Sequence, residues 1–256
     1  MDIMFLGTCA CDYSPLLKTT YKDVFDKDAR RSSCALVNGK YLIDCGEHCM
    51  ESLRIAKVDP AQITDIFVTH LHGDHYNEEH IRQIAAASER VLRVWVRFDA
   101  KTSDIPNVEW KYMQKAAAYV VEDGVTLTGL LANHEEAFFP QHLLLEVNGK
   151  KIFYALDGAW FLFETYYALK NAQLDLLVLD CTCGDYEGDY RIGEHNTIPM
   201  IRLMLPSLKK WGTIVEKTQV YVTHLAPSLH KTHDETVKIL GKDGVGVAYD
   251  GLTLSV

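Results

Sequence analysis

The 256-residue sequence lacks several features that would assign its class at once. It has no basic excess, because 26 Lys and Arg face 35 Asp and Glu, a formal net charge of −9. Nucleic-acid binders usually carry a basic stripe, so an extended nucleic-acid partner is not expected. No apolar run reaches the roughly 20 residues that span a membrane. Residues 1–6 also lack the basic start of a signal peptide. We therefore predict a cytoplasmic protein without a membrane partner.

No Pro- or Gly-rich linker interrupts the chain, and cysteine is odd in number. Seven cysteines without a secretion signal favour reduced thiols over a disulfide framework. The pairs Cys9/Cys11 and Cys181/Cys183 both follow predicted strands. A separate metal or redox cluster is one reading of them, but small buried thiols are the preferred one. With 48% hydrophobic residues the chain can build a full core, and we predict a single domain over residues 1–256.

Strand and helix signals alternate along the chain. Asn38-Gly39 and Asn148-Gly149 are strong hairpin dipeptides, and apolar residues at helical spacing mark the helices. We predict strands at 2–7, 34–44 (two, around the first dipeptide), 65–69, 91–98, 118–132 (around Asp123-Gly124), 142–156 (around the second dipeptide), 174–179 and 219–223, a short strand pair at the end, and helices at 47–57, 78–87, 161–171, 198–210 and 233–241.

Two echoes in the same order suggest an internal duplication. Val37-Asn38-Gly39-Lys40, which leads to Asp44, recurs as Val147-Asn148-Gly149-Lys150, which leads to Asp157. Val68-Thr69-His70-Leu71 recurs as Val222-Thr223-His224-Leu225. We predict two similar halves whose sheets pack face to face with helices outside, which is a four-layer α/β sandwich.

Four potential metal ligands stand within six residues in His70-Leu71-His72-Gly73-Asp74-His75, directly after a predicted buried strand. Alternate residues of an extended segment point the same way, so His70 and His72 can converge on one ion. Gly73 permits a sharp turn that redirects Asp74 and His75 towards a second ion. Imidazole nitrogens and a carboxylate suit zinc, iron or manganese. The segment therefore predicts a metal centre.

The same segment resembles the His-x-His-x-Asp-His signature of the metallo-β-lactamase superfamily, and later residues match the family pattern in order. The resemblance implies an αββα sandwich with two divalent transition-metal ions, zinc above all and manganese or iron as alternatives. Asp44, in Asp44-Cys45-Gly46, would support the metal loop without binding metal. The implied ligands are His70, His72 and His134 for the first ion, Asp74, His75 and His224 for the second, and Asp157 as the bridge.

This ligand set implies a hydrolase. Two metals about 3.5–4 Å apart bind a water between them, and the resulting hydroxide attacks phosphorus or a carbonyl carbon. Asp74 and His195 are the catalytic candidates. His195 lies in a glycine-rich loop before a predicted helix, and we assign it proton donation to the leaving group and substrate contact. A role for His195 as an exposed loop or helix-cap residue stays open.

Further motifs resemble one branch of the superfamily, which contains the phosphoribosyl cyclic phosphodiesterase of phosphonate breakdown. They are Phe5-Leu6-Gly7-Thr8, Arg30-Arg31-Ser32-Ser33, and His195 followed by Asn196-Thr197. The resemblance implies hydrolysis of a small or cyclic phosphodiester, with Arg31 or Ser32 contacting phosphate. A solvated basic turn is the alternative for those two residues. The structural zinc of that enzyme has no match here, because only Cys9-x-Cys11 remains of its cysteine cluster.

Other readings of the metal centre stay open at this stage. The same ligands would serve a carboxylic-ester, lactone or thioester hydrolase, and a metal-binding scaffold without catalysis is a third class. A small-molecule phosphodiester is the expected partner. A homodimer is also compatible with the sequence.

Overall fold

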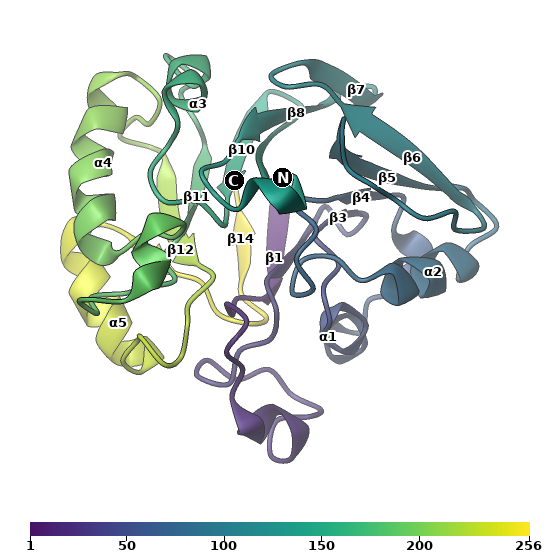
Figure 1. Cartoon of the computed structure of the whole chain (residues 1–256), viewed down its shortest axis with the longest axis horizontal. Coiled ribbons are helices and arrows are strands. Elements are labelled where there is room, and N and C mark those ends of the chain that lie inside the picture. Colours follow the sequence, from purple (N-terminus) through teal and green to yellow (C-terminus); the bar gives the residue numbers. More distant parts are fainter.

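Two β-sheets form the centre of the computed structural model, which describes all 256 residues (Figure 1). The strands of the first sheet are β1 (Asp2–Gly7), β2 (Cys34–Val37), β3 (Tyr41–Ile43), β4 (Asp65–Phe67), β5 (Leu92–Arg97), β6 (Val108–Met113) and β14 (Thr253–Ser255). Their spatial order is β14-β1-β2-β3-β4-β5-β6. Pairing is antiparallel from β14 to β3 and parallel from β3 to β6.

The second sheet repeats this plan. Its strands are β7 (Ala118–Glu122), β8 (Val125–Leu131), β9 (Gln141–Val147), β10 (Lys150–Ala155), β11 (Leu176–Asp180), β12 (Gln219–Thr223) and β13 (Gly246–Val247). Pairing is antiparallel from β7 to β10 and parallel from β10 to β13. Strands β1 to β6 therefore correspond in order to β8 to β13, and the predicted two similar halves are confirmed.

The two sequence echoes differ in what they mark. Asp44 follows β3 and Asp157 follows β10, which are equivalent strands, so the first echo marks equivalent positions. His70 follows β4, whereas His224 follows β12, the counterpart of β5. The true counterpart of β4 is β11, which ends at Asp180. The second echo is therefore not a pair of equivalent positions.

Helices cover the outer faces of both sheets, which completes the predicted four-layer sandwich (Figure 1). Helices α1 and α2 lie beside the first sheet, and α3, α4 and α5 lie beside the second. The helices are α1 (Cys49–Ala56), α2 (Glu78–Ala86), α3 (Phe163–Ala168), α4 (Ile198–Lys210) and α5 (His233–Leu240), and the short 3₁₀ helices are η1 (Pro15–Lys18), η2 (Pro60–Gln62), η3 (Glu136–Phe138), η4 (Tyr190–Gly193) and η5 (Gly241–Asp243). None of these helices is long and apolar enough to cross a bilayer.

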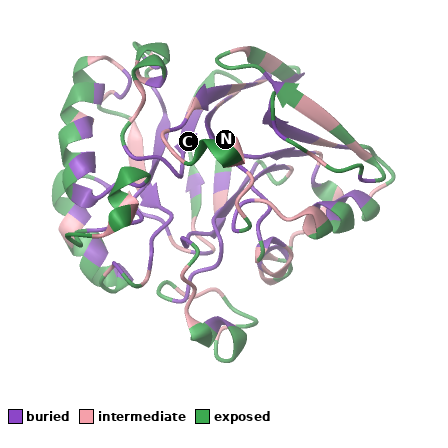
Figure 2. Ribbon diagram, in the orientation of Figure 1, coloured by how far each residue is buried: buried purple, intermediate pink, exposed green.

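Three apolar clusters hold the layers together. The largest, of 22 buried residues, lies between the sheets and includes Phe5, Phe67 and Tyr154. One cluster of 18 joins the first sheet to α1 and α2, and another of 18 joins the second sheet to α3, α4 and α5. Figure 2 shows the result, with buried strands inside and helices exposed on their outer faces. Strands β4 and β11 are buried along their whole length, as is usual for parallel strands that are covered on both faces. The residues at their ends are therefore held in fixed positions.

Local sequence signals explain most of the strand connections. Both hairpin dipeptides adopt positive φ at both residues, 49° and 70° at Asn38-Gly39 and 50° and 79° at Asn148-Gly149, as the tight hairpin turn requires. Two expectations differ from the structure. Strand β6 has no predicted counterpart, and the closing strands β13 and β14 join different sheets instead of pairing with each other.

Candidate metal centre and active site

The metal loop follows β4 and is held from behind by Asp44. One carboxylate oxygen of Asp44 accepts the Thr69 backbone N–H at 2.7 Å, and the other lies 2.8 Å from His75 Nδ1. Gly46 allows this loop to pack closely, because a Cβ there would lie 1.8 Å from the Asp74 carbonyl oxygen. The predicted turn after His72 is present, with the His75 N–H donating to the His72 carbonyl at 2.9 Å. Gly73 itself does not have a positive φ, so the turn does not need glycine there.

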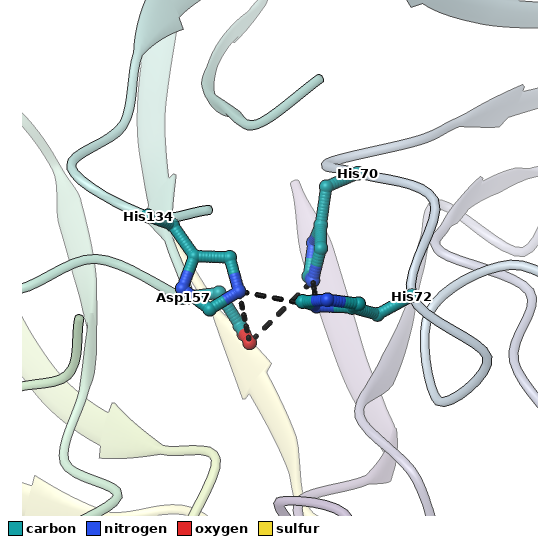
Figure 3. Close-up of side chains that lie close together, drawn as sticks. All are labelled: His70, His72, His134 and Asp157. Atoms are coloured by element: carbon teal, nitrogen blue, oxygen red, sulfur yellow. Dashed lines mark hydrogen bonds and ion pairs between the residues drawn. The ribbon is translucent and has the colours of Figure 1, made fainter. Parts of the chain in front are cut away.

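Four of the predicted ligands converge in one group, drawn in Figure 3. His70 Nε2 lies 2.9 Å from His72 Nδ1, and His134 Nε2 lies 3.1 Å from the same His72 atom. Asp157 Oδ2 lies 3.6 Å from His70 Nε2 and 3.8 Å from His134 Nε2. The structure thus brings together residues that follow β4, β8 and β10.

A second group forms on the other oxygen of the same aspartate. Asp74, His75 and His224 lie together, with 3.2 Å between His75 Nε2 and His224 Nε2. Asp157 Oδ1 lies 3.2 Å from His75 Nε2 and 3.1 Å from His224 Nε2. The two carboxylate oxygens of Asp157 therefore face the two groups, one each, which is the arrangement of a bridging ligand.

These groups fit two divalent cations. Asp157 is only 3% exposed, yet its Oδ1 accepts no hydrogen bond, and the buried Nδ1 of His134 has no partner either. Imidazole nitrogens crowded to about 3 Å around a carboxylate repel one another unless a proton or a cation lies between them. The donor set of nitrogen and carboxylate oxygen suits a transition metal.

The protonation states point the same way. Although burial alone would raise it, the pKa of Asp157 is held well below its usual range by the His224 and His75 imidazoles. Burial lowers the pKa of His70 well below its usual value, which favours the neutral imidazole that binds metal. The site therefore offers an anionic bridge and a neutral nitrogen donor.

His195 lies against the second group, held by residues that the sequence reasoning missed. Its Nδ1 is 2.6 Å from Asp180 Oδ2 and 3.0 Å from the Thr182 hydroxyl, and its ring stacks on His224 with 5.4 Å between centroids. Thr182 also lies 2.7 Å from His224 Nδ1. Burial alone would lower the pKa of His195, but Asp180 raises it to about 9.

A sequence signal for these supports was available. Asp180 is the last residue of the buried strand β11 and Thr182 follows two positions later, so both can point the same way at this edge of the sheet. The first sheet uses the end of β4 for its metal loop, and β11 is the equivalent strand. Asp180 in turn has its pKa lowered by the neighbouring His195, against the raising effect of burial.

A cavity of about 480 Å³ opens onto the metal groups. Besides the metal groups, its lining includes Tyr13, whose buried hydroxyl has no hydrogen-bond partner, and the guanidinium of Arg191. The residues that line it are Ala10, Cys11, Tyr13, Glu47, His72, Gly73, Asp74, His134, Glu135, Asp157, Thr182, Tyr190, Arg191, Glu194, His195 and His224.

Arg31 and Ser32 lie elsewhere, so the predicted phosphate contacts do not agree with the structure. The Arg31 side chain is 0% exposed, pairs with Glu51 at 2.8 Å and donates to the Tyr21 carbonyl. The Ser32 hydroxyl accepts the His48 N–H. Both residues sit in the segment that joins β1 to β2 and neither lines the cavity. Arg31 is a buried structural cation, and the alternative of a solvated basic turn fails as well.

The two Cys-x-Cys pairs do not form a metal cluster. All seven cysteines are free, and no candidate metal group contains one. Cys9, Cys181 and Cys183 are buried, as the preferred reading expected, whereas Cys11 is exposed at the cavity.

Comparisons by sequence cover parts of the chain. A family model described as anti-Pycsar protein Apyc1 matches residues 25–95. Ribonuclease Z of Methanothermobacter thermautotrophicus is 36% identical over 77 residues, 29% of this chain and 21% of that protein. Zinc phosphodiesterase ELAC protein 1 of Bos taurus is 39% identical over 80 residues, 30% of this chain and 18% of that protein. The matched region thus spans about a fifth of these curated relatives.

Comparisons by structure cover nearly the whole chain. The metallo-β-lactamase fold protein YhfI from Bacillus subtilis has a TM-score of 0.73 at 15% identity and covers 99% of this chain and 98% of its own. The short form of human tRNase Z has a TM-score of 0.70 at 18% identity, covering 100% and 99%. A diphosphatase of the PhnP family has a TM-score of 0.72 at 19% identity, covering 99% and 96%. The chain has the metallo-β-lactamase fold.

Proposed function

We propose that this chain is a dinuclear metal-dependent hydrolase that cleaves small or cyclic phosphodiesters. The observation that carries the proposal is Asp157, whose two oxygens face two separate groups of ligands. A pair of bound divalent ions, with zinc as our first choice, would supply an activated water and would stabilise negative charge on oxygen.

The chain's own residues divide the remaining work. Asp44 fixes the loop that carries His70 to His75, so that the ligands are oriented before substrate arrives. Asp180 and Thr182 occupy Nδ1 of His195, which leaves Nε2 as the ring nitrogen free to give a proton to the leaving oxygen. His195 is part of the cavity lining, so this proton is delivered where substrate binds.

The choice of a small phosphodiester has two supports. The cavity of about 480 Å³ has the size of a small-molecule site. Its lining includes Glu47, Glu135 and Glu194, and the chain carries a net charge of −9, which disfavours an extended nucleic acid. Among the relatives, one is a zinc phosphodiesterase by name and another is a diphosphatase.

A cytoplasmic location fits this proposal, because all seven cysteines are free and a reducing compartment keeps thiols in that state. We propose no membrane partner and no partner chain for catalysis. A homodimer would be compatible with the activity, since both metal groups are built from one chain.

A substrate panel tests the proposal. Purified protein is assayed with bis-p-nitrophenyl phosphate, cyclic nucleotides, lactones and thioesters, before and after chelation, with zinc, manganese or iron restored in turn. We expect diester hydrolysis that is lost with the metal and regained on its return. Hydrolysis of lactones or thioesters without any diester turnover would replace the proposal with the carboxyl-ester alternative. Metal binding without turnover of any substrate would favour a scaffold.

A further inference from the structure

The cavity wall carries a single arginine or lysine side chain, and it is Arg191. Five carboxylates line the same cavity: Glu47, Asp74, Glu135, Asp157 and Glu194. Asp74 and Asp157 belong to the metal groups, but the three glutamates do not. An anionic substrate that enters the cavity is therefore repelled by the glutamates, and apart from the proton donor His195 the cationic side chain that it can approach is Arg191.

Arg191 is held in a fixed orientation by Asp189. Nε lies 2.9 Å from Asp189 Oδ1, and Nη2 lies 3.1 Å from Asp189 Oδ2. The same carboxylate accepts the Arg191 backbone N–H at 2.9 Å and so begins the 3₁₀ helix η4. These bonds use one edge of the guanidinium and leave Nη1 without an acceptor in the protein.

The backbone links this arginine to the proposed proton donor. The Arg191 carbonyl accepts the His195 N–H at 2.8 Å and the Glu194 N–H at 2.9 Å. Arg191 and His195 thus stand one turn apart on the same cavity wall. A group bound by Arg191 would lie in the same cavity as the imidazole proposed to serve the leaving oxygen.

We propose that Arg191 determines specificity by binding an anionic oxygen of the substrate through Nη1, and that Asp189 is its positioning residue. The inference rests on the proposed phosphodiesterase function. A guanidinium with one edge fixed presents its remaining N–H groups in a defined direction, which suits a phosphoryl oxygen. The site then selects a phosphodiester, which carries one negative charge, over a neutral ester or lactone of the same size.

The decisive measurement compares two ligands that differ in charge and hardly in shape. Dimethyl phosphate is a monoanion, and trimethyl phosphate is its neutral counterpart. Their dissociation constants are measured by ³¹P NMR titration of the zinc-loaded protein, and hydrolysis of bis-p-nitrophenyl phosphate is followed in parallel. For Arg191→Gln we expect dimethyl phosphate to bind about 10- to 100-fold more weakly, as loss of a charged hydrogen bond implies. Trimethyl phosphate should bind as before.

The kinetics should separate binding from chemistry. In Arg191→Gln the KM for the diester should rise with the dissociation constant of dimethyl phosphate, while kcat changes less and the zinc content stays at the wild-type level. Arg191→Lys keeps the charge and should recover part of the affinity. Asp189→Asn weakens the hydrogen bonds that orient Arg191 and should give an intermediate loss of affinity for dimethyl phosphate.

Arg202→Gln is the matched control. Arg202 pairs with Asp243 at 2.8 Å on the outer face of α4, away from the cavity, so its loss should leave all constants unchanged. If Arg191→Gln binds dimethyl phosphate as wild type does, or loses both ligands equally, the inference is overturned while diester hydrolysis by the wild type still stands. If the wild type does not hydrolyse diesters, the proposed function itself fails. Should Arg191→Gln not fold, the Arg191→Lys and Asp189→Asn data decide.

Discussion

The two halves of the molecule share one strand order but supply the site in different ways. In the first half, a single loop after β4 carries His70, His72, Asp74 and His75, and Asp44 holds it from behind. In the second half, the residues come from the ends of four separate strands. They are His134 after β8, Asp157 after β10, Asp180 at the end of β11 and His224 after β12.

The two halves therefore hold their ligands in place in different ways. The loop of the first half is fixed by hydrogen bonds from Thr69 and His75 to one residue, Asp44, which follows the neighbouring strand β3. The residues of the second half meet because β10, β11 and β12 are adjacent parallel strands whose carboxyl ends share one sheet edge. Their geometry depends on the register of the whole sheet.

Among these variants, loss of Asp157 should have the largest effect on metal binding and rate, because this residue is the one ligand that faces both metal groups. For Asp157→Ala we expect metal content and rate to fall together. The rate loss should exceed about 100-fold, which is the upper limit for loss of a residue that only supports a metal ligand. Metal analysis and diester kinetics on the same sample check this. Asp185→Ala, at an exposed aspartate, serves as the control. Full activity in Asp157→Ala would reject the bridging role.

The two buried supporting carboxylates should give different losses. Asp44→Asn disturbs His75 and the metal loop, so metal affinity should drop by about 10- to 100-fold. Asp180→Asn disturbs His195 and, through Thr182, His224, so the rate should drop more than metal affinity. Competition with a chelator and kcat measured at saturating metal separate the two effects. Equal profiles for the two variants would show that both halves rely on one kind of support.

His195→Ala tests proton donation by the histidine that Asp180 and Thr182 of the second half hold in place. We expect kcat to fall about 10²- to 10⁴-fold for diesters with alkyl leaving groups, the range of general acid catalysis, and much less for p-nitrophenyl esters. Nitrophenolate leaves without a proton, so the ratio of the two rates isolates proton donation. Similar losses for both leaving groups would argue against that role.

The contacts of Asp250, which link the two halves, predict a different kind of effect, a pH dependence of stability instead of a loss of rate. Asp250 follows β13, accepts the Thr8 hydroxyl and the Arg31 N–H, both at 2.8 Å, and so joins the two ends of the fold. Burial raises the pKa of Asp250 from 3.8 to about 7. Since the folded state holds the proton more tightly than the unfolded state, stability from this group is present below pH 4 and is lost as the pH rises to 7.

Denaturant unfolding between pH 4 and 8 measures this linkage. In the wild type, Asp250 should lower the free energy of unfolding by up to about 1.4 kcal/mol per pH unit between pH 4 and 7. Asp250→Asn should flatten that slope, and the difference between the two curves should level off above pH 7. Parallel curves over the whole range would contradict the raised pKa.

The clustering of ligand residues in one short segment also explains which parts of the site could be predicted from the sequence. Six consecutive residues with four potential ligands are visible without any fold, and the hairpin dipeptides with an aspartate downstream locate Asp44 and Asp157. Positions of His134 and His224 came from the resemblance to a family pattern. Arg191 and Tyr13 lie far apart in sequence and meet only across the cavity, so no spacing rule points to them.

Arg31 shows the converse error. The resemblance to a family motif implies a phosphate contact for Arg31, but in the structure the guanidinium is enclosed by Glu51 and two backbone carbonyls. Exposure cannot be read from two adjacent arginines, because it depends on residues that pack against them from Tyr21 to Val24 and from α1. The order of ligands was predictable, whereas the assignment of polar groups to the cavity or to the interior was not.

The pairing of β14 with β1 has a consequence for how the chain matures during synthesis. Ile3 lies opposite Leu254, and the Gly251 N–H donates to the Phe5 carbonyl at 2.7 Å, so β1 pairs with a strand that is synthesised much later in the chain. Until β14 has left the ribosome, one edge of β1 has no partner and is open to association with other nascent chains. Pairing with β14 closes that edge, and the hydrogen bonds from Thr8 and Arg31 to Asp250 can form only once residue 250 has left the ribosome.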